Sequence, residues 1–111
     1  MQQAMAIDRE HLTRMTFGDR SLEREVLQLF DRQAVMLIER IRAGNPTAIA
    51  SLAHTLKGSA MGIGAGLVAR SADETENAAG RSAAECGQAI DRLASAIDEA
   101  RALIAELLRE A

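Results

Sequence analysis

The sequence has no tryptophan or tyrosine, only two phenylalanines, one proline and one cysteine. Because Cys86 stands alone, an intrachain disulfide and a zinc cluster built from cysteines are both excluded. Aromatic and β-branched residues are scarce, whereas alanine and leucine are common, and this balance favours helices over strands. We therefore expect an all-α protein.

The sequence also lacks a basic stripe and a long apolar run. Its formal net charge is -3 with acidic and basic residues interleaved, whereas a nucleic-acid binder needs a basic surface that neutralises phosphates. No apolar run approaches the roughly 20 residues that cross a membrane, and residues 1–11 show no secretory signal pattern. We expect a cytoplasmic protein that binds neither nucleic acid nor membrane.

The length and the helical patterning indicate one domain. At 111 residues, 48% of them apolar, the chain can form one modest core, so we expect a single domain over residues 1–111. Apolar spacing and capping signals predict a short N-terminal helix at about 8–14 and longer helices at about 21–42, 46–61, 65–79 and 82–108. Short connections make successive helices antiparallel, which predicts an up-and-down four-helix bundle.

Local signals support three of these boundaries. Asn45 is a favoured N-cap, and Pro46 at the first helical position loses no intrahelical hydrogen bond. Ser82 and Glu85 have the spacing of a capping box, and Gly80 is the expected C-terminal cap of the preceding helix. In the 21–42 helix we expect an inward apolar face made of Leu22, Val26, Leu29, Phe30, Leu37 and Ile41. In the last helix, the expected inward residues are Cys86, Ile90, Leu93, Ile97, Ile104 and Leu107.

The helix that begins at Pro46 carries the candidate functional face. Its expected core stripe consists of Ile49, Leu52, Ala53, Leu56, Ala60 and Ile63. His54 lies roughly 140° from the centre of that stripe on a helical wheel, so we expect its side chain to point outward. The same outer face carries Thr47, Ala50, Ser51, Lys57, Gly58 and Met61.

This outer face suits phosphoryl chemistry. Neutral imidazole is a good nucleophile, so His54 is a candidate phosphoryl acceptor. Lys57 lies one turn further on the same face, where an ammonium group can offset the charge of a phosphoryl group. Gly58 costs the helix about 1 kcal/mol relative to alanine, and close approach of a partner's carboxylate is one reason for a glycine there. Close packing of another helix is the alternative reason.

One segment resembles a known signature, namely His54-Thr55-Leu56-Lys57-Gly58-Ser59-Ala60. Histidine-containing phosphotransfer (HPt) domains carry the pattern His-x-Leu-Lys-Gly-Ser-(Ala/Ser), followed by a Gly-Ala step that corresponds here to Gly64-Ala65. A looser resemblance extends over Phe17-Gly18-Asp19, Leu29-Phe30 and Glu76. Thr75 departs from the family pattern, which has a larger apolar residue before this glutamate, and the departure bears on local packing.

The resemblance implies a phosphorelay intermediate. In such a relay, His54 accepts a phosphoryl group from the phosphoaspartate of a receiver domain and passes it to the aspartate of another response regulator. The receiver supplies Mg²⁺, and we expect the chain to have no cofactor of its own, no metal site and no autonomous kinase activity. The implied partners are receiver domains and a hybrid histidine kinase, and we expect the chain to be a monomer. The candidate partner-binding residues are Thr47, Ala50, Ser51, Gly58 and Met61.

Other functions account for fewer of these sequence features. A complete histidine kinase would not fit in the chain, and a kinase dimerisation domain would have an acidic residue at Thr55 and a proline at Ser59. The phosphoacceptor domain of a chemotaxis-type kinase shares the His-x-x-Lys-Gly pattern but would normally continue into further domains, whereas this sequence ends at Ala111. A metal-binding bundle is disfavoured because His11 is the only other histidine. A non-catalytic helical adaptor stays open.

Overall fold

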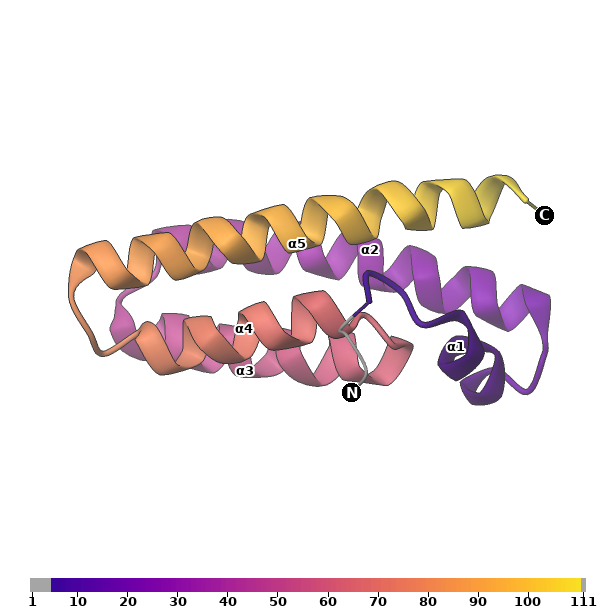
Figure 1. Ribbon diagram of the computed structural model, residues 1–111, viewed down its shortest axis with the longest axis horizontal. Coiled ribbons are helices and arrows are strands. Elements are labelled where there is room, and N and C mark those ends of the chain that lie inside the picture. The colour runs from indigo at the N-terminus through magenta and orange to yellow at the C-terminus, as the bar shows by residue number, and fades with distance from the viewer. Residues whose placement is uncertain (1–4, 111) are drawn as a thin grey trace.

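A computed structural model describes residues 5–110, which form five helices and no strand (Figure 1). The helices are α1 (Arg9–Met15), α2 (Arg20–Ala43), α3 (Pro46–Ile63), α4 (Gly66–Ala78) and α5 (Ala83–Arg109). These bounds differ from the expected ones by no more than two residues, and the all-α prediction is confirmed. None of the helices within residues 5–110 has the length and apolar character that crossing a membrane requires.

Side chains cap four of the helices at their N-termini. Each cap accepts a hydrogen bond from a backbone amide of the first turn, which satisfies a donor that has no partner within the helix. The caps are Asp8, Asp19, Asn45 and Ser82. The prediction for Gly80 is wrong, because α4 ends at Ala78 with Ala79 as its C-cap and Gly80 does not have a positive φ.

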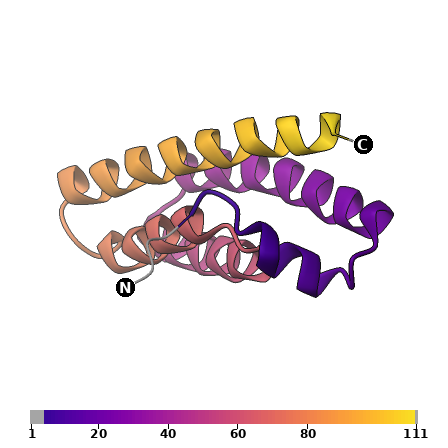
Figure 2. The same cartoon turned by 45° about the vertical axis from the view of Figure 1, so that its right-hand side comes forward.

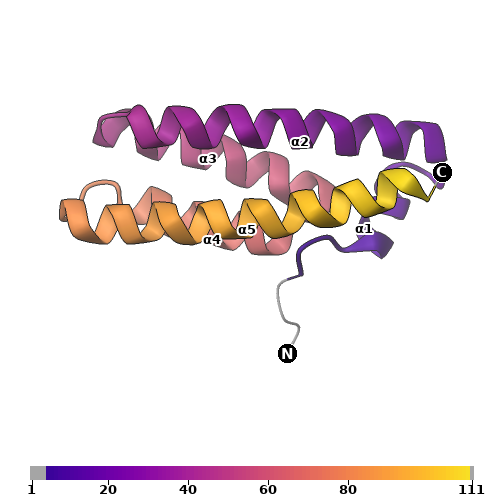
Figure 3. The ribbon, with the colours of Figure 1, turned by 90° about the horizontal axis from the view of Figure 1, so that it is seen from above.

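The four long helices run in alternating directions (Figures 1 and 3). Each packs against its neighbour in the sequence, and α5 also packs against α2. Only two residues connect α2 to α3 and α3 to α4, so these pairs have to fold back on each other. This arrangement is consistent with the expected up-and-down four-helix bundle. Both α2 and α5 extend past the ends of α3 and α4, and α1 lies beside this extension (Figure 2).

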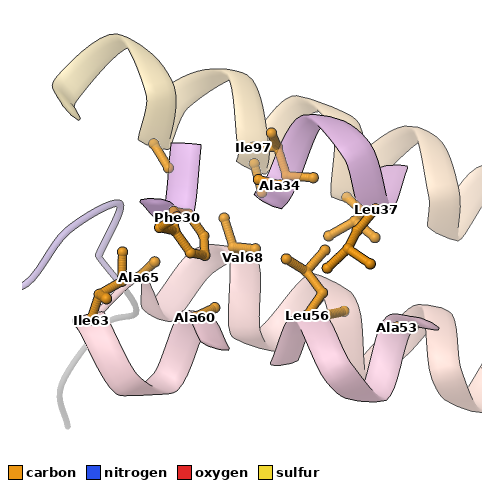
Figure 4. Packing of buried hydrophobic residues seen from close by; sticks show 14 of the residues in the cluster. Phe30, Ala34, Leu37, Ala53, Leu56, Ala60, Ile63, Ala65, Val68 and Ile97 are labelled. Carbon is orange, nitrogen blue, oxygen red and sulfur yellow. The ribbon is translucent and has the colours of Figure 1, made fainter. Parts of the chain in front are cut away.

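The core lies between the four long helices and contains many alanines. Fully buried alanines let the helices approach closely around larger side chains such as Phe30, Leu56 and Val68 (Figure 4). On α3 the expected stripe is buried except Leu52, which is half-buried, and all six residues expected inward on α5 are buried.

The expected inward face of α2 is partly wrong. Leu22 and Leu29 are exposed by 38% and 60%, whereas Leu27 and Ala34 occupy the core. The helix has apolar residues on more than one face, so spacing alone did not show which of them α3 and α5 would cover.

Asp8 and His11, which precede α2, bond to the junction between α3 and α4. The amide of Asp8 donates to Gly64 O at 2.8 Å, and His11 Nε2 donates to Gly62 O at 3.1 Å. Gly64 has φ of +79°, and a Cβ there would lie 3.0 Å from Asp8 O, so both the turn and the close contact require glycine. This junction sets how α4 lies along α3, which matters for the site below.

The buried hydroxyl of Thr75 is accommodated within the helix pair α4 and α5. It donates to Ser71 O at 2.8 Å, and it also lies 3.3 Å from Ala89 O on α5. A buried hydroxyl with hydrogen-bond partners carries little penalty. The departure of Thr75 from the family pattern therefore leaves the packing intact.

Candidate functional site

His54 lies in the middle of α3 with its side chain 67% exposed, as the helical wheel predicts. Its Nδ1 atom lies 3.1 Å from Glu76 Oε2 and 3.3 Å from Oε1 on α4. An ionised carboxylate only accepts hydrogen bonds, so Nδ1 carries a proton and donates a hydrogen bond to Glu76. In the neutral ring the lone pair then resides on Nε2, and no hydrogen bond to Nε2 occurs within residues 5–110. Nε2 is thus the nucleophilic nitrogen of the neutral ring.

Lys57 lies beside His54, but it is paired with two carboxylates of α4. Its Nζ atom is 3.0 Å from Asp73 Oδ1 and 3.4 Å from Glu76 Oε1. The hydrogen bond to Asp73, with a smaller contribution from Glu76, raises the pKa of Lys57 above its usual 10.5. Lys57 therefore carries a positive charge at every physiological pH.

The pairing of α3 with α4 was not predicted, although the sequence holds a signal for it. Residues equally distant from a tight turn face each other in an antiparallel helix pair. His54 and Glu76 each lie eleven residues from Ala65, and Lys57 and Asp73 each lie eight residues from it. The Gly64-Ala65 turn thus predicts both contacts once the two helices are known to be antiparallel.

The other candidate residues share the face of His54. Thr47, Ser51, Gly58 and Met61 are exposed, and Ala50 is half-buried. A Cβ built on Gly58 would meet nothing within 4 Å outside its own helix. Close helix packing therefore does not explain this glycine, and space above the helix is what its missing side chain provides.

An exposed apolar stripe on α2 was also missed, because two of its members were assigned to the core. Leu22, Leu29 and Met36 are spaced by seven residues and form one line along the helix, exposed by 38%, 60% and 44%. Three side chains on another flank of α2 bond to α5, namely Arg24, Asp31 and Arg42. By helical spacing the apolar stripe lies roughly 150° around α2 from these three side chains, and α2 packs against α3 as well as α5.

The site has no arrangement of metal ligands of its own. Within residues 5–110, no group of three or more histidine, cysteine, aspartate or glutamate side chains could hold a metal ion. The polar chemistry at His54 is instead that of a nucleophilic nitrogen, a carboxylate behind the ring, and a lysine one turn away.

Comparisons with known proteins identify the family of the chain. A sequence profile of the Hpt domain matches residues 24–107. The fold is similar to the X-ray structure of a rice protein described as a histidine-containing phosphotransfer protein, with a TM-score of 0.83 and 20% identity. That alignment covers 94% of this chain and 80% of the rice chain. No curated protein matches the sequence. Since the profile spans most of the sequence, including the helix of His54, the chain belongs to the Hpt domain family.

Proposed function

We propose that this Hpt domain is a phosphorelay intermediate whose phosphoryl acceptor is His54. It accepts the group from the phosphoaspartate of a receiver domain and passes it to the aspartate of a response regulator. The observation that carries this proposal is the hydrogen bond between His54 Nδ1 and Glu76, which in the neutral ring places the lone pair on Nε2 of an exposed side chain. A nucleophile held by a second group is the usual arrangement in covalent group transfer.

The chemical step follows from that geometry. The lone pair of His54 Nε2 attacks phosphorus, the bond between phosphorus and the aspartyl oxygen breaks, and the receiver regains its carboxylate. The ring keeps its proton on Nδ1 and becomes positively charged, and the adjacent Glu76 carboxylate offsets that charge. Onward transfer is the reverse step with a second aspartate. Mg²⁺ held by the receiver would offset the charge of the transferring group.

The proposed docking surface for the receiver is the outer face of α3 together with the α2 stripe. Gly58 leaves space next to His54, and the small side chains of Ala50 and Ser51 keep this face low. Leu29 and Met36 of the stripe lie along the part of α2 that runs beside α3, and they supply apolar area, which binding surfaces bury at their centre. Flexible methionines at Met36 and Met61 suit a surface that meets more than one receiver.

We expect Leu29→Glu to weaken receiver binding by about tenfold, since central apolar residues dominate interface energies. The exposed position and the similar helix propensities of leucine and glutamate predict little change in stability. Gln28→Glu is the matched control, because it adds the same charge at an exposed position about 100° around the helix. Titration calorimetry with a receiver domain measures both variants. Equal affinities for the two variants would show that Leu29 of α2 is not part of the docking surface.

We expect Lys57→Ala to slow phosphoryl transfer by about twofold to tenfold, because an ammonium group one turn from His54 is lost. Since the pKa of Lys57 is raised, its positive charge stays constant from pH of about 6 to about 9. Stopped-flow transfer kinetics at low and moderate salt provide the measurement, because screening weakens the contribution of an exposed charge. Parental rates for the variant at both salt concentrations would leave Lys57 with no role in transfer.

A two-receiver assay tests the proposed function itself. A receiver carrying radiolabelled phosphate is incubated with the chain, and a second, unlabelled receiver is then added. We expect the label to appear first on the chain and then on the second receiver. A chain that stays unlabelled with receivers that bind it would instead be a non-catalytic helical adaptor.

A further inference from the structure

Three charged side chains next to His54 carry more negative than positive charge. Lys57 contributes the only ammonium group, and it lies between the carboxylates of Asp73 and Glu76. Glu76 also bonds to His54, whereas the only ion pair of Asp73 within residues 5–110 is with Lys57. The shorter of the two lysine contacts is the one with Asp73, at 3.0 Å.

We propose that Asp73 holds Lys57 in the unphosphorylated protein and so lowers the stability of the phosphohistidine, which favours onward transfer. This inference rests on the proposed role of His54. Asp73 is a positioning residue, because its contact in the site is with Lys57 and it touches neither the ring nor the phosphoryl group.

The charges explain the direction of the effect. A phosphoryl group on Nε2 brings about two negative charges, and Lys57 is the cation one turn away on the same face. To bind the phosphoryl group, the Lys57 side chain has to break or weaken its ion pair with Asp73. Asp73 also repels the phosphoryl group directly. Removing its charge therefore stabilises the phosphorylated state in two ways.

The structure offers a clean variant for the test. The side chain of Asp73 is 51% exposed, and it neither caps a helix nor packs in the core. Asn has nearly the same shape and a similar helix propensity, so Asp73→Asn should fold normally. Glu74→Gln is the matched control, because it removes the same charge from the next residue on α4. Glu74 pairs with Arg92 of α5 and not with Lys57.

The first measurement is the equilibrium of phosphoryl exchange between the chain and one receiver that labels the parent. Asp73→Asn should shift this equilibrium toward the phosphorylated chain by about twofold to fivefold, the range for a partly exposed charge pair. Glu74→Gln should leave it at the parental value. An equilibrium unchanged in Asp73→Asn, or shifted equally by Glu74→Gln, would overturn the inference.

Two further measurements separate this role from a structural one. In a Lys57→Ala background, the effect of Asp73→Asn should become smaller, because only direct repulsion remains. In the unphosphorylated protein, an NMR titration should show the pKa of Lys57 falling toward its usual value in Asp73→Asn. An undiminished effect without Lys57, or an unchanged lysine pKa, would contradict the inference. A parent that takes no label overturns the proposed function together with this inference, whereas a labelled parent with an unresponsive Asp73→Asn overturns this inference alone.

Discussion

His54→Gln is expected to abolish phosphoryl transfer while leaving the helix content unchanged. Glutamine has no nucleophilic ring nitrogen, so no N-phosphoryl bond can form. The side chain of His54 is 67% exposed and lies outside the core, so its replacement should affect stability by only a few tenths of a kcal/mol. Transfer of radiolabel from a phosphorylated receiver and far-ultraviolet circular dichroism provide the two readouts.

His11→Gln is the control for this experiment. His11 is half-buried and donates from Nε2 to Gly62 O, so its ring is engaged at the junction between α3 and α4. Its replacement should leave labelling intact, with at most a modest loss of stability. Undiminished labelling of His54→Gln, or an equal loss of labelling in both variants, would show that His54 is not the sole acceptor.

Gly58→Gln is expected to reduce the transfer rate by about a hundredfold while leaving stability equal or higher. Replacing glycine with glutamine inside a helix stabilises the helix by up to about 1 kcal/mol. A Cβ at this position meets nothing outside its own helix, so the structure predicts no clash within the protein. The longer side chain would instead occupy the space above α3, where a misplacement of about 1 Å costs roughly a hundredfold in rate.

Opposite changes in stability and activity are the signature of this prediction, because a folding defect lowers both. Gly58→Ala is the graded control, and it should stabilise the helix with a smaller loss of rate. Thermal midpoints and transfer rates of both variants give the comparison. A glutamine variant that unfolds more easily would make Gly58 a packing residue. One that is stable and transfers normally would mean that the receiver approaches from another direction.

Local rules predicted the helices and the direction of His54. The caps at Asn45 and Ser82 and the apolar spacing in α3 and α5 depend on neighbours within a few residues, so the sequence contains them directly. The exposure of His54 followed from its angle to the core stripe of its own helix. The family signature around it belongs to the same short segment.

The missed features depend on contacts between helices. Leu29 is apolar and has helical spacing, but it is exposed because α3 and α5 cover a neighbouring face of α2. Glu76 and Asp73 lie 22 and 16 residues away from their partners His54 and Lys57, and the turn at Gly64 sets their register. Lys57 was expected to offset the charge of a phosphoryl group. In the structure it pairs with two carboxylates of α4.

The stability in acid and base of the bond between the label and the parent chain tests the central claim most directly. A receiver carrying radiolabelled phosphate is mixed with the unmodified chain, and the labelled chain is then exposed to acid and to base. Phosphate on the Nε2 atom of His54 is expected to be lost in acid and kept in base, and peptide mapping should place it on the segment that contains His54. Label that survives acid, or that base removes, would contradict phosphorylation of His54.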